Sequence, residues 1–388
     1  MNLAPILPGG TLGVLGGGQL GRMFVHAAQR LGYFTAVLDP DAASPAGRVS
    51  HHHIQTPYLD AQGLERLAAT ADAITTEFEN VPAAALEALA AHRPVAPAAA
   101  AVAIAQDRAR EKAHFASVGV ACAPHAVIET AEDLAAVSDD LLPGILKTAR
   151  LGYDGKGQER VTNRAELVDA WGRLGQVGCV LEKLLPLSFE CSVIVARGAD
   201  GNVVHFAPQR NLHRHGILAV TEANDSILPT VLARRAVAAA TAIANGPEYV
   251  GVLCVEFFVL HDGVLVVNEI APRPHNSGHY TIDACDVSQF ELQVRTLAGL
   301  PLVAPRQHSP SVMLNLLGDL WFDPADGHER TPAWDAVLAL PGAHLHLYGK
   351  EDAKPGRKMG HLTFTGPTVG AVRTTALQAA TLLGIEPF

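Results

Sequence analysis

The sequence predicts a mixed fold, α/β in its N-terminal part and α+β in the rest, and three observations support this. The chain has 388 residues, enough for two to three domains of about 150 residues each. Residues 1–105 alternate short apolar runs with longer helical patterns, which is typical of a doubly wound parallel sheet. Beyond them, strand-like runs predominate. Because 48% of the residues are hydrophobic and only 18% are charged, we expect a compact globular protein.

The N-terminal α/β domain is predicted to span residues 1–105. Its strands and helices alternate in the order TLGVLG, QLGRMFVHAAQRLG, FTAVLD, LDAQGLERLAATA and AITTEF. Ala-rich segments at 83–91 and 98–105 flank RPVAP, which we expect to form one more strand that closes this unit.

Three further segments follow. Residues 106–185 combine a helix (DRAREKAHFASVG), a strand (GILKTA), a Gly-rich loop, another helix and a strand (CVLEKL). Residues 186–304 contain the strand-like runs ECSVIVARG, VVHFAP, CVEFFVL and GVLVVNEIAP around one Ala-rich helix, so Glu256 and Glu269 are predicted to lie on neighbouring strands. Residues 305–388 are predicted to form short strands, loops and a final helix, TTALQAATLLG.

Charge and cysteine content exclude several classes of partner. The 29 basic and 39 acidic residues give a net charge of −10, so no basic field exists to hold a nucleic-acid backbone. The five cysteines are isolated, without a CxxC pair, which suits a reducing compartment. The N-terminus shows no charged leader followed by an apolar run, and no stretch reaches about 18 apolar residues. We therefore expect a cytoplasmic protein with no membrane partner.

The first glycine turn joins a predicted strand to a predicted helix. Gly16, Gly18 and Gly21 satisfy a GxGxxG pattern whose amides can hold a phosphate. Asp39 ends the next strand near the distance required for a ribose contact, so an NAD-dependent oxidoreductase is one alternative. A tight strand-to-helix turn also requires glycine for steric reasons alone.

The second glycine-rich loop spans 152–157 and follows Lys147. Its backbone amides can close over a triphosphate, while Lys147 and Lys156 offset the negative charge. The alternative is an ordinary hairpin turn with a solvated lysine.

Two carboxylates and a polar run predict the reactive part of the site. Glu256 and Glu269, with Asn268 beside the second, offer oxygen ligands of the kind that hold Mg²⁺ against phosphate oxygens. A purely structural role is less favoured, because charged residues inside apolar strands are costly to bury unpaired. The run Arg273–His279 can orient an anionic substrate and hydrogen-bond an oxyanion, unless it is a turn of incidental polarity.

Two basic or metal-like segments have simpler alternatives. Contiguous His51, His52 and His53 would point to opposite faces of a strand, so we interpret them as an exposed strand or loop rather than a metal site. The segment 350–358 holds three lysines and an arginine in an acidic protein, which a phosphate-bearing substrate would explain.

Taken together, GGGQLGRM, TTEFENVP, LGYDGKGQ, VEFF, NEIAPRPHNSGH and GRKMGHL resemble the N5-carboxyaminoimidazole ribonucleotide synthase family of the ATP-grasp superfamily. The resemblance covers nearly the whole chain, and its most specific parts are GQLGRM and APRxHNSGH. It implies an ATP-grasp fold with a Rossmann-like pre-ATP-grasp domain, a lid subdomain (106–185), a central metal-bearing domain (186–304) and a small β-rich C-terminal segment (305–388). It also implies a homodimer.

The reaction that the resemblance implies uses ATP, bicarbonate and 5-aminoimidazole ribonucleotide, with Mg²⁺ as cofactor and carboxyphosphate as intermediate. ATP would contact Arg108, Lys147, Gly152, Tyr153, Asp154, Gly155, Lys156, Gly157, Gln158, Glu182, Lys183, Leu184, Leu185, Glu190, His213, Asn268 and Glu269. Mg²⁺ would be held by Glu256 and Glu269. The bicarbonate and ribonucleotide site would comprise Gln19, Leu20, Glu77, Tyr153, Asp154, Arg273, His275, Asn276, Ser277, Lys350 and Arg357.

Individual roles follow from the same resemblance. Arg273, His275, Tyr153, Asp154 and Lys350 would be catalytic. Glu182, placed after a strand, would set its backbone against the adenine edge, and Glu190 would accept from the ribose hydroxyls. Leu151 stands where some relatives carry a glycine, which alters loop mobility at most. A formate-dependent glycinamide ribonucleotide transformylase and a non-catalytic ATP-binding regulator are the remaining alternatives.

Overall fold

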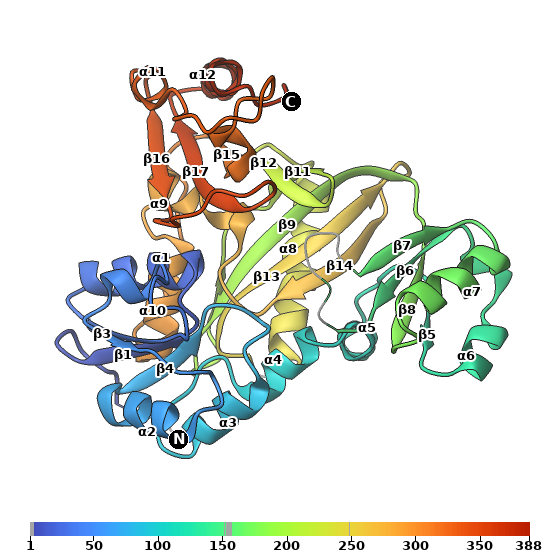
Figure 1. The fold of residues 1–388 in the computed structure, drawn as a ribbon, viewed down its shortest axis with the longest axis horizontal. Helices are drawn as coiled ribbons and strands as arrows, with labels where there is room; N and C mark the ends of the chain where they lie inside the picture. The colour runs from blue at the N-terminus through green and yellow to red at the C-terminus, as the bar shows by residue number, and fades with distance from the viewer. Residues whose placement is uncertain (1–3, 151, 153–156, 248) are drawn as a thin grey trace.

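The computed structural model describes residues 4–150, 152, 157–247 and 249–388. Figure 1 shows an N-terminal domain and a small lid sheet on opposite sides of a large central sheet, with the C-terminal residues above the N-terminal domain. No helix in the described ranges is long and apolar enough to cross a membrane.

The N-terminal domain is built on a four-stranded parallel sheet in the order β3-β2-β1-β4, as the alternating pattern predicts. Its strands are β1 (Thr11–Leu15), β2 (Phe34–Leu38), β3 (His52–Ile54) and β4 (Ala73–Thr76). Its helices are α1 (Gln19–Arg30), η1 (Gly47–Val49), α2 (Ala61–Thr70), α3 (Ala83–Ala90) and α4 (Ala99–Ala105). The histidine triplet runs into β3, with His51 and His52 exposed, so the interpretation as an exposed strand is confirmed.

The prediction that RPVAP forms a strand is wrong. Val95 forms only an isolated parallel bridge to Ile74. Pro94 and Pro97 flank this bridge, and because proline has no backbone N–H, the ladder cannot extend in either direction.

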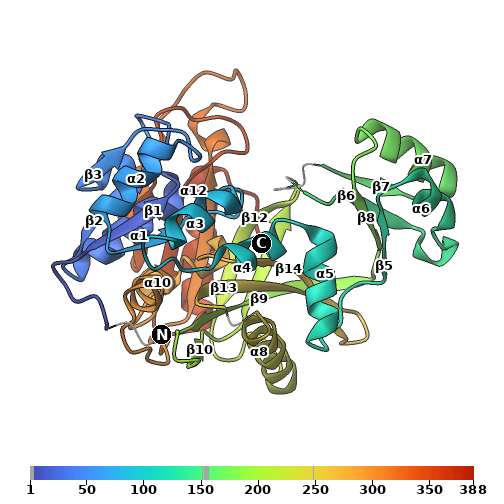
Figure 2. The ribbon, with the colours of Figure 1, turned by 90° about the horizontal axis from the view of Figure 1, so that it is seen from below.

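The lid sheet contains four antiparallel strands in the order β5-β8-β6-β7. Its strands are β5 (His125–Ile128), β6 (Gly144–Thr148), β7 (Gln158–Val161) and β8 (Cys179–Lys183), and its helices are α6 (Ala131–Ala136), η2 (Asp139–Leu141) and α7 (Arg164–Arg173). Leu146, Leu167 and Leu181 form part of its own small core. Figure 2 shows this sheet standing apart from the N-terminal domain.

Helix α5 (Arg108–Ser117) joins the units. It begins at the cap Asp107, whose carboxylate accepts from Ala109 N and Arg110 N. Rather than packing only with the lid, α5 also contacts β14 of the central sheet, where Glu111 Oε1 accepts from Ile270 N at 2.7 Å.

The large sheet has nine strands, ordered β14-β13-β9-β11-β12-β15-β17-β16, with β10 beside β9. Its strands are β9 (Leu187–Arg197), β10 (Val203–His205), β11 (Gln209–Arg214), β12 (Ile217–Ala223), β13 (Gly251–Leu260), β14 (Leu265–Ala271), β15 (Ser311–Leu317), β16 (Ala343–Leu347) and β17 (Lys358–Thr365). Because β12 pairs with β15, the C-terminal strands continue the central sheet.

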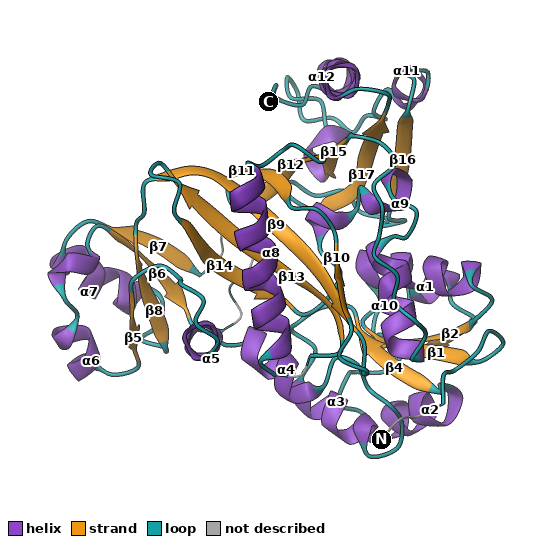
Figure 3. Cartoon of the chain, turned by 180° about the vertical axis from the view of Figure 1, so that it is seen from behind, coloured by secondary structure: helices purple, strands orange, loops and turns teal. Residues whose placement is uncertain are grey.

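Helices cover this sheet. They are α8 (Thr230–Asn245), η3 (Asn276–Gly278), α9 (Thr281–Ala284), α10 (Gln289–Ala298), η4 (Gly318–Trp321), α11 (Trp334–Leu338) and α12 (Val369–Leu383). Figure 3 shows α8 lying along β9, β13 and β14. Helix α10 buries Val294 and Leu297 against Phe24 and Val25 of α1, so an apolar joint holds the N-terminal domain on the central domain.

Candidate active site

One cleft of about 670 Å³ lies between the lid sheet, the N-terminal domain and the large sheet. Most of the predicted site residues line it, although they come from four separate regions of the chain. They are Gln19, Leu20, Glu77, Arg108, Lys147, Gly152, Gln158, Glu190, His213, Glu256, Asn268, Glu269, Arg273, His275 and Asn276.

The two predicted metal ligands are directly opposite each other. Glu256 on β13 pairs in register with Glu269 on β14, and a register shift follows immediately after Glu256. Burial and the charge of Glu256 raise the pKa of Glu269. Asn268 Oδ1 is buried without a hydrogen-bond partner in the described part of the chain. Two facing carboxylates beside an unpaired amide oxygen form a donor set that fits Mg²⁺.

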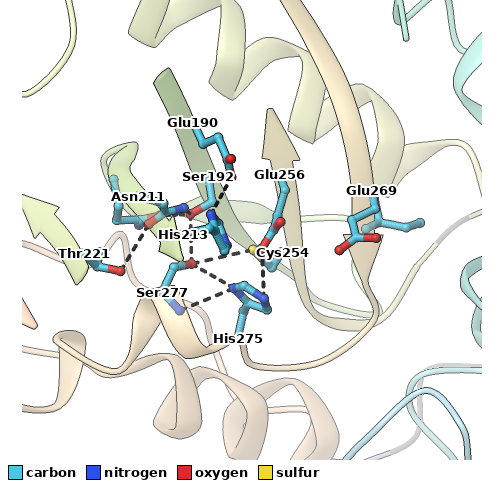
Figure 4. Close-up of polar contacts among 12 residues, drawn as sticks. Glu190, Ser192, Asn211, His213, Thr221, Cys254, Glu256, Glu269, His275 and Ser277 are labelled. Atoms are coloured by element: carbon cyan, nitrogen blue, oxygen red, sulfur yellow. Dashed lines mark hydrogen bonds and ion pairs between the residues drawn. The ribbon is translucent and has the colours of Figure 1, made fainter. Parts of the chain in front are cut away.

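His275 contacts the first of these carboxylates. Its Nε2 lies 3.0 Å from Glu256 Oε1, and its Nδ1 lies 2.9 Å from Ser277 Oγ (Figure 4). Burial alone would raise the pKa of Glu256, but His275 outweighs it and lowers this pKa to about 2. Burial likewise opposes protonation of His275, but Cys254 and Glu256 raise its pKa to about 10. Both shifts favour the charged form of each partner in this contact.

Ser277 does not line the cleft. It is fully buried, and its hydroxyl is hydrogen-bonded to Ser192 Oγ at 2.8 Å as well as to His275. The chain of contacts continues from Ser192 through Asn211 to Thr221 (Figure 4). Ser277 thus supports the His275 ring from behind, whereas the sequence predicted a substrate contact.

Gln289 holds the loop that carries His275. Its Oε1 accepts from His275 N at 2.8 Å, and its Nε2 donates to His275 O at 2.7 Å and to His279 Nδ1 at 3.1 Å. A Cβ on Gly278 would lie 2.5 Å from Gln289 Oε1, so only glycine permits this approach.

Arg273 is fixed by a partner that the sequence pattern does not single out. Glu79 forms an ion pair with it, with Arg273 Nη2 donating to Glu79 Oε1 at 3.0 Å. Although burial opposes ionisation, Arg273 lowers the pKa of Glu79 to about 2. Glu79 lies two residues beyond the predicted Glu77, in the same motif.

The first glycine turn holds carboxylates of the protein itself. Gly17 N donates to Asp39 Oδ2 at 2.7 Å, and Gly18 N and Gly21 N donate to Glu77 at 2.6 and 2.7 Å. Because these three amides and Asp39 are engaged with each other and with Glu77, the ribose contact by Asp39 loses its structural support, while a phosphate contact elsewhere in this turn stays a prediction. The oxidoreductase alternative loses its structural basis.

A buried charge cluster borders the end of the cleft that faces the lid sheet. Glu182 lies 2.8 Å from Lys147 Nζ and 2.9 Å from Lys112 Nζ. Despite burial, these lysines lower the pKa of Glu182 to about 2. Glu182 lies inside β8, so the prediction that it follows a strand is wrong, and it does not line the cleft. Lys112, only 1% exposed, has no signal in its local sequence.

Glu190 and His213 face each other across β9 and β11, where they form an ion pair (Figure 4). Glu190 raises the pKa of His213, although burial opposes this. Both side chains line the cleft.

Several predicted residues lie elsewhere. Gly157, Lys183, Leu184, Leu185, Lys350 and Arg357 are not among the cleft-lining residues. Lys350 Nζ donates to Lys358 O at 2.6 Å, and Arg357 donates to Asp352 O at 2.7 Å. Lys358 lines the cleft instead. Tyr153, Asp154, Gly155 and Lys156 lie outside the described residues.

Comparison with protein families divides the chain as the fold does. Residues 10–106 match the ribonucleotide synthetase preATP-grasp domain, 113–290 the ATP-grasp domain, and 311–375 the phosphoribosylaminoimidazole carboxylase C-terminal domain. These matches confirm the predicted ATP-grasp fold and its Rossmann-like N-terminal domain. The individual boundaries at 105, 185 and 304 stay predictions.

Individual relatives match over almost the entire chain. The N5-carboxyaminoimidazole ribonucleotide synthase of Brucella melitensis is 44% identical over 370 residues, covering 95% of this chain and 99% of the relative. The crystal structure of an ADP complex of N5-carboxyaminoimidazole ribonucleotide synthetase has a TM-score of 0.89 and 38% identity, with 98% of each chain covered.

A second solved structure, N5-carboxyaminoimidazole synthase from Aspergillus clavatus in complex with ADP and 5-aminoimidazole ribonucleotide, has a TM-score of 0.88 and 32% identity. The match covers 98% of this chain and all of that one. Shared fold, near-complete coverage and identity of this level accompany a cleft that joins an acidic pair to the Arg273–His279 run. The chain therefore belongs to the N5-carboxyaminoimidazole ribonucleotide synthase family of ATP-grasp ligases.

Proposed function

We propose that this chain carboxylates 5-aminoimidazole ribonucleotide to N5-carboxyaminoimidazole ribonucleotide in purine biosynthesis, using ATP and bicarbonate and releasing ADP and phosphate. A bicarbonate oxygen attacks the γ-phosphorus of ATP, which gives carboxyphosphate and ADP. The amine nitrogen then bonds to the carboxyl carbon while the bond from that carbon to the phosphate oxygen breaks. Phosphate leaves, and the amine loses a proton.

The observation that carries this proposal is that Glu256 and Glu269 line the same cleft as Arg273, His275 and Asn276. Acidic ligands for a metal–phosphate complex therefore lie beside cationic groups suited to an anionic acceptor. Such preorganised charge supplies much of the catalysis in phosphoryl transfer.

The nucleotide is assigned to the side of the cleft that faces the lid sheet. Lys147 and Lys112 together exceed the charge of Glu182 by one, so this end carries a net positive charge suited to phosphates. Arg108 links this end of the cleft to the two carboxylates Glu256 and Glu269, because its Nη2 lies 3.6 Å from Glu269 Oε2. Glu190 is placed to accept from ribose hydroxyls, as the resemblance implies.

Mg²⁺ is assigned to Glu256 and Glu269, with Asn268 adjacent. When bound there, it would offset the charge of the phosphate oxygens during transfer. The mutual repulsion that raises the pKa of Glu269 supports this assignment, because a cation between the carboxylates would relieve it.

The amine-transfer step is assigned to Arg273 and His275. Glu79 holds the Arg273 guanidinium in place, while Ser277 and Gln289 hold His275. Both cations then face the carboxyphosphate oxygens without reorganising. Asn276, whose amide atoms have no partner among the described residues, is assigned to substrate.

The test measures Mg²⁺-dependent ADP release with 5-aminoimidazole ribonucleotide and bicarbonate together, and then with each omitted. We expect ADP release to require the ribonucleotide and bicarbonate. Release that responds instead to formate with glycinamide ribonucleotide would replace the proposal with the transformylase chemistry. Nucleotide binding without any turnover would indicate a regulator.

The assembly is proposed to be a homodimer, by resemblance to the family. Multi-angle light scattering of the purified chain measures its mass directly, and a mass near 40.8 kDa would exclude the dimer.

A further inference from the structure

Three side chains with metal-ligating atoms converge next to the proposed Mg²⁺ site. Cys254 and Glu256 are two residues apart on β13 and therefore point to the same face of the sheet. His275 approaches them from the loop after β14 (Figure 4). One ligand atom from each of the three lies within 4.8 Å of the others.

The His275 ring is held so that Nε2 faces the other two side chains. Its Nδ1 lies 2.9 Å from Ser277 Oγ and accepts from Ser277 N at 3.3 Å, and Ser277 is held in turn by Ser192. This leaves Nε2 facing Glu256 at 3.0 Å. Metal-binding histidines characteristically have their second ring nitrogen fixed by such an outer partner.

The chemistry of this set differs from that of the Mg²⁺ ligands. A thiolate and an imidazole are soft or borderline donors that select zinc and similar ions, whereas Mg²⁺ prefers carboxylate and carbonyl oxygens. Glu256 belongs to both sets of ligands. With Glu269 it forms the proposed Mg²⁺ site, and with Cys254 and His275 it forms a set suited to softer ions.

A metal can reach this second set from the cleft. Glu256 and His275 line the cleft, whereas Cys254 is fully buried behind them. Three protein ligands with an open side toward solvent match the form of a four-coordinate zinc site whose last position is taken by water.

We propose that Cys254, Glu256 and His275 form a site for Zn²⁺ or a related thiophilic divalent ion, and that occupancy of this site excludes Mg²⁺ from Glu256. Binding requires the metal to displace two protons, one from the Cys254 thiol and one from His275 Nε2, where it now faces Glu256. The existence of the site does not depend on the ligase reaction. Only its inhibitory consequence rests on the proposed function.

A second cluster, Asp283, His346 and His361, does not support the same inference. The His346 and His361 rings are stacked, with only 11° between their planes. Because a metal lies close to the plane of each imidazole that binds it, two parallel rings cannot direct their lone pairs at one ion.

Binding is tested first without turnover, by titrating the metal-free protein with Co²⁺. A cobalt–thiolate charge-transfer band is expected for the wild type and should disappear in Cys254→Ala. Cys254→Val repeats the test with a larger side chain, in case the alanine variant folds poorly. Cys122→Ala is the matched control, because Cys122 is the most accessible of the described cysteines, and this variant should keep the band. A band retained in both Cys254 variants, or absent from the wild type, would overturn the proposal.

Inhibition is tested next, by adding Zn²⁺ to the ligase assay at fixed Mg²⁺. Measured against its own zinc-free rate, Cys254→Ala should require about 100-fold more Zn²⁺ for half inhibition, since losing a direct ligand should cost at least as much as losing an outer-shell partner. Raising Mg²⁺ should relieve the inhibition of the wild type. Equal zinc sensitivity of the two proteins would contradict the proposal. If neither protein turns over, the proposed function fails while the cobalt result still decides the site.

Discussion

At the scale of single residues, Glu182 balances two lysines at the end of the cleft that faces the lid sheet. It is buried between Lys112 and Lys147, which lower its pKa from 4.5 to about 2. Because the folded-state pKa lies below the unfolded one, the ionised carboxylate stabilises the fold above about pH 4.5, and this contribution is lost as pH falls toward 2.

Glu182→Gln should lower the free energy of unfolding by about 3–5 kcal/mol at pH 7, because it leaves two lysines without their shared carboxylate. Urea unfolding measures this, and the difference from the wild type should shrink between pH 5 and pH 3. Glu159→Gln is the control, since it removes a solvent-accessible ion pair with Arg173 and should change stability little. An undiminished difference at low pH would show that the ion pairs are not the cause.

Glu269→Gln should reduce kcat by about 100-fold or more, since it removes one of two facing carboxylates at the proposed Mg²⁺ site. The Mg²⁺ concentration needed for half-maximal rate should rise as well. Steady-state ADP release measures both quantities. Asp262→Asn, in the turn between the same two strands, should behave as the wild type. Full activity of the Glu269 variant would remove this carboxylate from the mechanism.

Residue-level prediction succeeded where chemistry is local and failed where partners are distant. Glu256 and Glu269 stand out because a charge interrupts an apolar strand. Lys112 and Glu79 acquire their roles only from Glu182 and Arg273, which lie 70 and 194 residues further along the chain. Local sequence contains no signal for Lys112, and although Glu79 lies in the motif TTEFENVP, the motif does not reveal its pairing with Arg273.

At the scale of elements, the loop from Arg273 to His279 is held by Gln289 of α10 in addition to its own turn hydrogen bonds. Gly278→Ala should displace it, because the new Cβ would lie 2.1 Å from Ile194 Cδ1 and 2.5 Å from Gln289 Oε1. We expect a loss of about 1–3 kcal/mol in stability and a fall in kcat larger than that loss explains. Gly172→Ala in α7, where a Cβ meets nothing within 4 Å, is the control and should be neutral or slightly stabilising. Equal kcat for both variants would contradict the role of this contact.

The element predictions were right where periodicity is strong. The alternation in residues 1–76 and the final Ala/Leu helix are both confirmed, and the two acidic strands pair as predicted. The errors at RPVAP and Glu182 concern single positions at strand ends, where hydrogen bonding from distant segments decides the outcome. Hydrophobic pattern does not record those bonds.

At the scale of the whole molecule, α10 holds the N-terminal domain and the central domain in the relative position that forms the cleft. Leu297→Ala should cost about 2–5 kcal/mol, because it opens a cavity in the joint with α1. Since Gln19 and Leu20 at the start of α1 line the cleft, the KM for the ribonucleotide should rise as well. Thermal unfolding and steady-state kinetics measure the two effects. Leu382→Ala, 45% exposed on α12, should change neither.

The pairing of β12 with β15 also bears on solubility. A chain ending before Ser311 would leave β12 (Ile217–Ala223) as an open edge, with a row of unpaired N–H and C=O groups flanked by apolar side chains. Such an edge recruits strands from other molecules. The C-terminal strands therefore protect this edge from aggregation as well as contributing Lys358 to the cleft, and a chain shortened at residue 310 is expected to precipitate although the other cleft-lining residues remain.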